Sequence, residues 1–455
     1  MKISTASSSE SKLSLVLAAA FGIASAFAIL KVLPLSDKNI LFLLAFPLVG
    51  IFLLLVIMNV KIALILLLST RASLDYVLGL TRVGILGENI GIGGGINLFV
   101  LIVALLLMVQ KPGAIFETPI SKAWIFYLLI CALAVLYSPV RGRGVRLFLN
   151  LLTYYGMFTI PFILVNRLED KKFWLKVLFF STFFPVCFAN LDLLRGGAGD
   201  QYGMRIMGSF PHPNILAFYL VFVITLVFYV LRRDLFSLKS VGKTFLWIYV
   251  LDLFILLAAT KTRNAWLACW GLFFLYGLLK EKRYLFYCLI APLLTLLISP
   301  VRERLFDVLG SVDLEDVENL NSFTWRLRLW KASLSSLKET VLFGNGLASF
   351  EHAVEQLPGW DGRFGAHNTY LEVLFETGVL GFAAYVGIYL KLLKTFYTKM
   401  RNTISSLSTE YVLLFCYVGS YAVICFGDNM LYYLSFNWYF WFFVGVMTRS
   451  AQLGI

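Results

Sequence analysis

One short segment, Gly365-Ala366-His367-Asn368-Thr369-Tyr370-Leu371-Glu372, combines residue types that can do acid–base chemistry. A long polar stretch ends there and an apolar run begins, so His367 is expected where a water-exposed surface meets a membrane helix. Thr369 and Glu372 have the Thr-x-x-Glu spacing of a capping box, which predicts that the helix begins near residue 369. The positive end of the helix dipole then faces His367 and disfavours the imidazolium. We therefore predict that His367 is a general base that accepts a proton from a substrate hydroxyl.

The polar residues that follow His367 are candidates for supporting roles. Asn368 is expected to orient the loop or a bound sugar. Glu372 and Glu376 lie one helical turn apart, so either can orient the imidazole. The alternatives are that Glu372 only caps the helix and that Glu376 is a packed polar residue. For His367 itself, the alternative to catalysis is a structural role in bracing the loop.

The composition of the chain restricts it to one broad class of protein. Of its 455 residues, 60% are apolar and only 14% are charged, and the mean hydropathy is +0.82. No water-soluble globular domain is so apolar and so poor in charge. The apolar runs are continuous rather than alternating, which favours helices over a barrel. We therefore predict an all-α polytopic membrane protein. The cysteines fall in or beside apolar runs and have neither metal-ligand nor disulfide spacing.

The apolar runs predict about 14 transmembrane helices, or about 12 or 13 if the shortest runs do not span, because a span needs roughly 17–25 residues. We expect a single integrated domain, in which residues 1–299 hold spans 1 to 11 and residues 369–455 hold spans 12 to 14. Residues 300–368 are expected to form a large extracytoplasmic loop with short amphipathic helices. The predicted spans are 13–33, 40–58, 61–80, 96–110, 122–138, 146–166, 173–194, 213–231, 244–260, 264–279, 284–299, 369–390, 410–427 and 430–447.

The charges of the loops predict an orientation. With both termini in the cytoplasm, the lysine-rich short loops fall inside, as the positive-inside rule requires, and the large loop faces outward. The outward loops are instead rich in arginine, whose planar fork pairs with phosphate in a bidentate manner. Lipid headgroups are the alternative partners, but the collective bias favours a phosphate-bearing substrate. These arginines are Arg82, Arg141, Arg143, Arg146, Arg195, Arg205, Arg263, Arg302, Arg304, Arg326, Arg328 and Arg363.

Four stretches together resemble the O-antigen ligase and O-antigen polymerase superfamily of bacterial envelope proteins, over roughly residues 120–395. The first is Arg205-Ile-Met-Gly-Ser-Phe-Pro-His-Pro-Asn214-Ile-Leu-Ala217, and the second is Thr260-Lys-Thr-Arg263-Asn-Ala. The third is Arg326-Leu-Arg-Leu-Trp330 followed by Gly344-Asn-Gly346, and the fourth is His367-Asn-Thr-Tyr-Leu371 with Glu376-Thr-Gly-Val-Leu-Gly381. The second stretch departs from the family at Thr262 and Asn264, where Ser and Gly are usual, but Arg263 stays in register.

The resemblance implies a membrane glycosyltransferase of the lipid-dependent, GT-C-like class. Such enzymes transfer a glycan from undecaprenyl diphosphate to an acceptor hydroxyl at the outer face of the bacterial inner membrane, with inversion and with no metal or other cofactor. A polymerase extends O-antigen or exopolysaccharide on a carrier-linked repeat unit, whereas a ligase transfers the glycan to lipid A–core. We favour the polymerase, with the ligase as the alternative. Expected partners are the undecaprenyl-diphosphate-linked glycan, a glycan or lipid acceptor, membrane lipids and chain-length regulator proteins, and no nucleic acid.

The residues support this chemistry in their own right. Breaking a sugar–diphosphate bond releases a leaving group whose negative charge grows in the transition state, and fixed cations stabilise that charge. Arg205 and Arg263, both at the outer surface, are the diphosphate-binding residues that the resemblance implies, and Arg326 is a third candidate. The alternatives are structural ion pairs and, for Arg326, contact with lipid headgroups. His212 and Asn214 lie beside Arg205 and are expected to line the same pocket, with a structural turn as the alternative for His212.

Two further patterns leave alternatives open. Residues 322–338 have apolar side chains at helical spacing with arginine and lysine around them, which predicts an amphipathic helix that lies on the membrane or packs within the loop. Charges inside predicted spans suggest a transporter as the alternative to an enzyme. However, Arg71 and Asp75 are four residues apart and can neutralise each other. A transporter is also expected to concentrate its charges at the midplane, whereas here the informative charges lie at the outer surface.

Overall fold

The computed structural model describes residues 59–80, 83–85, 88–90, 92–197, 204–295, 302, 322–335, 337, 340–357, 362–403 and 407–455. The predicted spans 13–33 and 40–58 lie outside the described residues, as do Arg82 and Arg304. Apart from one short antiparallel hairpin, β1 (Val83–Ile85) with β2 (Glu88–Ile90), the described elements are helices.

The helices follow the predicted apolar runs closely. In the first half of the chain they are α3 (Val60–Leu80), α4 (Ile92–Gln110), η2 (Pro112–Ile115), α5 (Ser121–Leu136), α6 (Arg141–Leu164), α7 (Leu168–Ser181), α8 (Phe183–Leu194) and α9 (Pro213–Arg233). In the second half they are α10 (Ser240–Ala259), α11 (Arg263–Leu279), α12 (Arg283–Thr295), α14 (Ser322–Ser335), α15 (Phe350–Glu355), α16 (Thr369–Asn402), α17 (Leu407–Gly427), η4 (Met430–Tyr432) and α18 (Leu434–Leu453).

Six stretches of the described chain are long and apolar enough to cross a membrane: α6, α7 with α8, α9, α10, α16 and α17. Shorter apolar helices lie at Gly94–Gln110, Ser121–Leu136 and Arg283–Leu293. The all-helical membrane architecture is therefore established. The number of about 14 spans stays a prediction, and so does the resemblance to GT-C-like enzymes.

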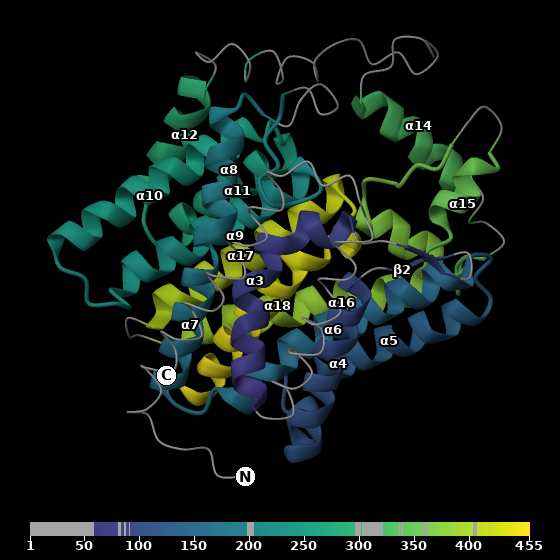
Figure 1. Cartoon of the computed structure of the whole chain (residues 1–455), viewed down its shortest axis with the longest axis horizontal. Helices are drawn as coiled ribbons and strands as arrows, with labels where there is room; N and C mark the ends of the chain where they lie inside the picture. The colour runs from purple at the N-terminus through teal and green to yellow at the C-terminus, as the bar shows by residue number, and fades with distance from the viewer. Residues whose placement is uncertain are drawn as a thin grey trace.

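Two helices, α9 and α18, form the centre of the bundle. Their side chains are buried almost all the way round, as expected for a helix that is apolar on every face. Figure 1 shows α18 inside the bundle with other helices around it. Aromatic rings fill the space between α18 and its neighbours; for example, the Tyr421 and Phe440 rings stack with their centroids 3.9 Å apart.

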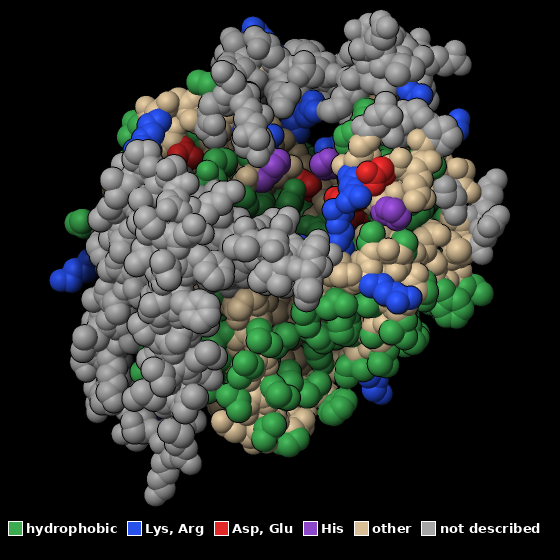
Figure 2. Space-filling model, turned by 45° about the vertical axis from the view of Figure 1, so that its right-hand side comes forward, with side chains coloured by type: hydrophobic (Ala, Val, Ile, Leu, Met, Phe, Trp, Pro, Cys, Tyr) green, Lys and Arg blue, Asp and Glu red, His purple; other side chains and the backbone are tan. Residues whose placement is uncertain are grey.

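The outer helices expose large apolar side chains instead of charges. On α5, Phe126, Leu129, Leu133 and Leu136 are exposed and recur every three or four residues, so they form one stripe along the helix. Such a stripe is unfavourable in water but suits contact with lipid. Figure 2 shows that the lower part of one face of the molecule is mainly hydrophobic, whereas charged residues gather higher on the same face.

Helix α16 is broken at Gly378, where φ is +66° and ψ is −171°. Loop residues 341–346 pair with the broken turn: Val379 N–H donates to Val341 O at 2.8 Å, and Asn345 N–H donates to Phe375 O at 2.9 Å. A side chain at Gly378 would collide with the Leu342 carbonyl. Glycine is therefore required both by the left-handed backbone and by this close approach. The break separates residues 369–377, which carry the predicted site, from the longer part of α16.

The predicted amphipathic helix forms as α14 and faces protein. Leu329 of α14 packs with Phe350, Val354, Leu371 and Phe375 in a small apolar cluster that α15 and the start of α16 complete. Trp330 Nε1–H donates to Ala366 O at 2.7 Å. Of the two alternatives for this segment, the structure therefore favours packing within the loop. In Figure 1, α14 and α15 lie together at one corner of the molecule.

Candidate active site

The ends of four helices meet at one place, which we call the junction: the starts of α9, α11 and α16, and the turn Gly427–Met430 that follows α17. Hydrogen bonds connect all four ends. Asn214 at the start of α9 donates to Asp428 Oδ2 at 2.6 Å, and the Thr369 hydroxyl donates to Asp428 O at 2.7 Å. Asn264 of α11 donates to Ile424 O at 2.9 Å. In Figure 2, histidine and residues of both charges gather around a hollow on one face of the molecule.

His367 faces the carboxylate of Asp428, which was not among the predicted site residues. Its Nδ1 lies 3.7 Å from Asp428 Oδ1, which is too long for a hydrogen bond but close enough for an ion pair when the imidazole is protonated. The His367 side chain is 40% exposed, whereas that of Asp428 is 2% exposed. Nδ1 itself is buried and has no hydrogen-bond partner among the described residues. The imidazole ring thus turns its buried Nδ1 toward Asp428, while the rest of the ring is partly exposed. This arrangement lets a carboxylate orient an imidazole base.

The backbone at His367 supports a functional interpretation. Its φ is +48°, a left-handed conformation that costs a non-glycine residue about 1–2 kcal/mol. Asn368 follows in an extended conformation and caps α16, because its side chain accepts a hydrogen bond from Leu371 N–H at 3.1 Å. The strained residue therefore lies directly before a well-capped helix. Such strain persists where surrounding contacts impose it, and it is common at functional sites.

Asp428 is held ionised by its neighbours. Burial raises the pKa of this carboxyl, but the imidazole of His367 and the Tyr433 hydroxyl lower it, and the net pKa lies below the usual value. Tyr433 donates to Oδ1 at 2.7 Å, and the Asn429 backbone N–H donates to the same oxygen at 2.9 Å. A buried carboxylate with this many donors keeps its negative charge and can stabilise positive charge on His367.

Arg205 connects the loop before α9 to two helices. Its Nε donates to Thr260 O at 2.7 Å, and its NH2 donates to Asn214 Oδ1 and to Thr262 Oγ1, each at 2.7 Å. Asn214 therefore connects the Arg205 guanidinium to Asp428, because it accepts from Arg205 and donates to Asp428. The predicted diphosphate-binding residue therefore lies at the junction, where much of its fork bonds to protein acceptors.

Arg263 and Arg326 approach the junction from two other elements. Arg263 is the first residue of α11, between Thr262, which bonds to Arg205, and Asn264, which bonds to α17. Arg326 reaches from α14 and donates to Gly427 O at 3.2 Å, next to Asp428. Burial lowers the pKa of Arg326, while Asp428 and Tyr433 raise it. The structure thus brings positive charge from three separate parts of the sequence to one region.

His212 caps α9 instead of lying free in a loop. Its Nδ1 accepts a hydrogen bond from Asn214 N–H at 3.1 Å, so the ring is neutral at this nitrogen. Burial lowers its pKa; Asp428 raises it, and the positive charges of Arg205 and His367 lower it. The structural role given as the alternative for His212 is therefore present, and Asn214, which His212 caps, donates to Asp428 Oδ2.

The glutamates of α16 do not reach His367. Glu372 accepts from Ala366 N–H at 2.9 Å, and Glu376 accepts from Phe350 N–H at 3.4 Å, so both side chains hold the loop to the helix. The predicted Thr369–Glu372 capping box also differs from the structure, because Asn368 is the cap and Thr369 bonds to the turn after α17. The carboxylate that lies near His367 Nδ1 is Asp428, at 3.7 Å.

Asp428 is the residue that sequence reasoning missed. It lies in the two-residue gap between predicted spans 410–427 and 430–447, and the predicted orientation puts that gap on the same side as His367. An acidic residue in such a short outward-facing turn could have marked Asp428 as a candidate partner for His367. It was overlooked because the turn has none of the residues that make the other four stretches stand out.

The junction offers no evident metal-binding set. Within the ranges that the structure describes, no group of three or more histidine, cysteine, aspartate or glutamate side chains is arranged to hold a metal ion. The described charges instead form pairs and hydrogen-bonded chains. Metal-independent transfer remains a prediction from the resemblance.

Comparison with known families gives one match. A family model described as O-Antigen ligase matches residues 245–386. Residues 245–386 are therefore similar to the O-antigen ligase family. This confirms the resemblance to the O-antigen ligase and polymerase superfamily, and it indicates glycan transfer of the ligase or polymerase type by a bacterial membrane protein. Arg263, Arg326 and His367 lie within the match, whereas Arg205, His212 and Asp428 lie outside it. No curated protein matches the chain.

Proposed function

We propose that the chain transfers a glycan from undecaprenyl diphosphate to an acceptor hydroxyl, with His367 as the general base. The observation that carries this proposal is the pairing of a partly exposed imidazole with the buried carboxylate of Asp428 at 3.7 Å, in a region that Arg205, Arg263 and Arg326 make positive. A base and fixed cations are the two requirements for displacing a diphosphate from a sugar.

In the proposed step, the acceptor oxygen attacks the anomeric carbon as His367 removes its proton. The bond between that carbon and the diphosphate oxygen breaks, and undecaprenyl diphosphate leaves with the electron pair. Attack from the side opposite the leaving group inverts the anomeric centre. Asp428 stabilises the imidazolium that forms, and the arginines stabilise the charge on the leaving group.

Arg205 has a double role in this proposal. Its hydrogen bonds to Thr260, Asn214 and Thr262 fix the starts of α9 and α11 relative to each other. The guanidinium keeps its charge while making these bonds, so it still attracts a diphosphate. Arg263 lies beside Thr262 and is the better candidate for direct bidentate contact.

The acceptor class and cellular location are part of the same proposal. We favour a polymerase that extends a carrier-linked repeat unit, with a ligase that uses lipid A–core as the alternative. The enzyme would act in the inner membrane with both termini in the cytoplasm, and the junction would face outward. Chain-length regulator proteins are candidate partners for a polymerase.

Reconstitution of the full chain in lipid vesicles with an undecaprenyl-diphosphate glycan tests the activity. Elongated carrier-linked glycan would identify a polymerase, and glycan transferred to added lipid A–core would identify a ligase. Transfer should proceed in the presence of a chelator. Strict dependence on Mg²⁺ or Mn²⁺ would contradict the mechanism, and movement of the intact donor across the vesicle membrane without transfer would favour a transporter.

A further inference from the structure

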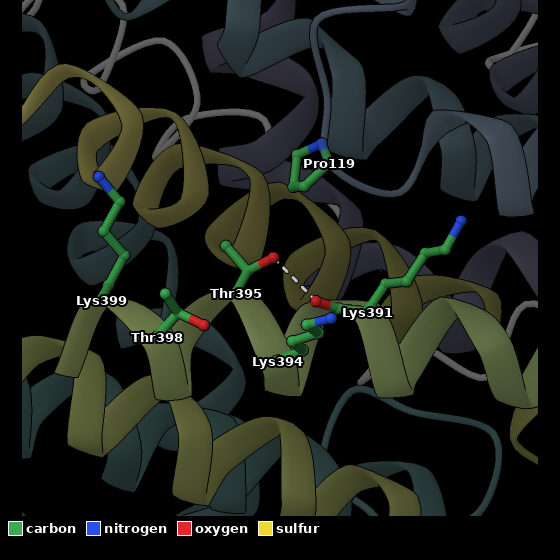
Figure 3. Close-up of a pocket in the computed structure, with 6 residues that line it drawn as sticks. All are labelled: Pro119, Lys391, Lys394, Thr395, Thr398 and Lys399. Atoms are coloured by element: carbon green, nitrogen blue, oxygen red, sulfur yellow. Dashed lines mark hydrogen bonds between the residues drawn. The ribbon is translucent and has the colours of Figure 1, made fainter. Parts of the chain in front are cut away.

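A second polar site lies far along α16 from His367. A cavity of about 390 Å³ is lined by Pro119 and by five residues of α16, namely Lys391, Lys394, Thr395, Thr398 and Lys399. Figure 3 shows the lysine and threonine side chains on neighbouring turns of the helix, with Pro119 facing them from another segment. Thr395 Oγ1–H bonds to Lys391 O at 2.8 Å.

The positive charge of this cavity is not neutralised by the described part of the protein. None of the three lysines forms an ion pair with a described acidic residue. Glu117, two residues before Pro119, already pairs with Lys111 at 3.2 Å and with Arg449 at 3.3 Å. Lys391 and Lys394 are three residues apart, a spacing at which like charges repel on a helix. A bound anion would remove this repulsion.

The length of α5 indicates where the cavity lies relative to a bilayer. It is at the start of α5, whose 16 residues rise about 24 Å to Tyr137, which contacts the loop at Phe343 beside the break in α16. With its flanking turns, this distance is close to the hydrocarbon thickness of about 30 Å. This length favours a position of the cavity near the membrane interface opposite the loop at Phe343.

Apolar side chains next to the cavity face outward. Leu390 precedes Lys391 and is 59% exposed, and Phe116 is three residues before Pro119 and is 72% exposed. Phe126, one of the exposed residues of α5, follows further along the same stripe. Cationic and hydroxyl groups that bind phosphate thus lie beside surface that suits acyl chains, a combination that matches a phospholipid better than a free anion.

We propose that this cavity binds the phosphate of an anionic glycerophospholipid at the interface opposite the junction. The three lysines attract the headgroup, the Thr398 hydroxyl donates to a phosphate oxygen, and the acyl chains follow Leu390 and α5. The Thr395 hydroxyl already donates to Lys391 O. This site is separate from the proposed glycosyltransferase activity, because no residue at the junction takes part in it.

The test measures lipid binding to the purified full chain by native mass spectrometry. Dioleoylphosphatidylglycerol and dioleoylphosphatidylcholine are titrated against the wild type and against K391Q/K394Q/K399Q. We expect the wild type to prefer the anionic lipid and the variant to bind it at least about tenfold more weakly, given that each lysine near an anionic surface contributes about fivefold. The control K172Q/K239Q/K282Q removes the same charge from three other exposed lysines and should bind like the wild type.

Two results would overturn the proposal. Equal weakening in the control variant would show that the preference comes from diffuse positive charge. Binding of inorganic phosphate that depends on the same lysines, without preference between the two lipids, would assign the cavity to a free anion. K394Q alone provides a milder change if the triple variant does not fold, with a smaller loss of the same preference expected. Glycan transfer by these variants in phosphatidylcholine vesicles shows separately whether the junction is intact.

Discussion

The two ends of α16 use charge in different ways. At its start, His367 lies against Asp428, and the nearby cations are tied into hydrogen bonds with neighbouring helices. Toward its other end, the three lysines around the cavity make no ion pair with the described acidic residues and line an open pocket. Charges that are fixed in place suit catalysis because they need no reorganisation in the transition state. Mobile lysines on flexible stems suit the looser recognition of a headgroup.

A similar contrast exists within the membrane helices. Arg71 and Asp75 lie four residues apart on α3 and pair at 2.5 Å, as predicted, and Ser435 also donates to Asp75. This buried pair is self-neutralised, unlike the positive region at the junction. The difference is that the Arg71–Asp75 pair balances its own charge, whereas the junction combines several cations with the single carboxylate of Asp428.

The largest expected effect comes from removing the proposed base. H367A should lower turnover by about 10²–10⁴-fold, the usual contribution of a general base. The matched control is H352A, because His352 lies on α15 near Glu355 and contacts Gln356, away from Asp428. Turnover by vesicle-reconstituted protein gives the comparison. Near-normal turnover by H367A would contradict its role as the general base. An equal loss in H352A would show that the effect is not specific to His367.

Asp428 tests whether the carboxylate acts through the imidazole. D428N keeps the shape of the side chain but removes its charge, so kcat should fall by about 10²-fold with little change in the KM for donor. A purely structural residue would not change the pH dependence of the rate, whereas loss of a charge that stabilises imidazolium should shift the acid limb of the kcat profile toward lower pH. An unshifted limb, or a loss confined to KM, would contradict the pairing with His367.

Arginine-to-lysine substitutions test whether the bidentate fork matters beyond the positive charge. R263K should lose about 10²-fold in turnover because lysine lacks the planar fork. R205K should lose turnover and also unfold at lower temperature, because the fork holds Thr260, Asn214 and Thr262. The control is R143K, since Arg143 pairs with Glu351 at a partly exposed position. Full activity in R263K would return that residue to a structural role.

His212 gives the smallest effect, on stability rather than on rate. Burial lowers its pKa, Asp428 raises it, and Arg205 and His367 lower it, so the folded state binds this proton less readily than the unfolded chain does. The contribution of His212 to the free energy of unfolding is therefore fully present above pH 6.5, the usual pKa of histidine, and decreases as the pH falls below that value. H212N retains a capping oxygen for Asn214 N–H but does not titrate. The drop in thermal unfolding temperature on acidification should be smaller in H212N, and identical pH dependence would contradict this origin.

The sequence predicted the helices well and the contacts among them poorly. The starts of α9, α11 and α16 follow from the ends of apolar runs, and the capping positions were wrong by one residue at Asn368. The break at Gly378 was not predicted, because its position depends on the loop residues Val341 and Leu342 that bond to it. The amphipathic pattern of α14 was recognised, but its partner was decided by the apolar cluster with α15 and α16.

By itself, the sequence determined that this is a helical membrane protein, whereas the roles of His367 and of the arginines stay predictions. Composition suffices for the first conclusion, because lipid requires apolar helices that satisfy their own backbone hydrogen bonds. Only the tertiary structure decided that Asp428, and neither Glu372 nor Glu376, faces the imidazole. The reason is that Asp428 is 61 residues away in the chain and reaches His367 only because α16 and α17 pack side by side, a contact that no local pattern encodes.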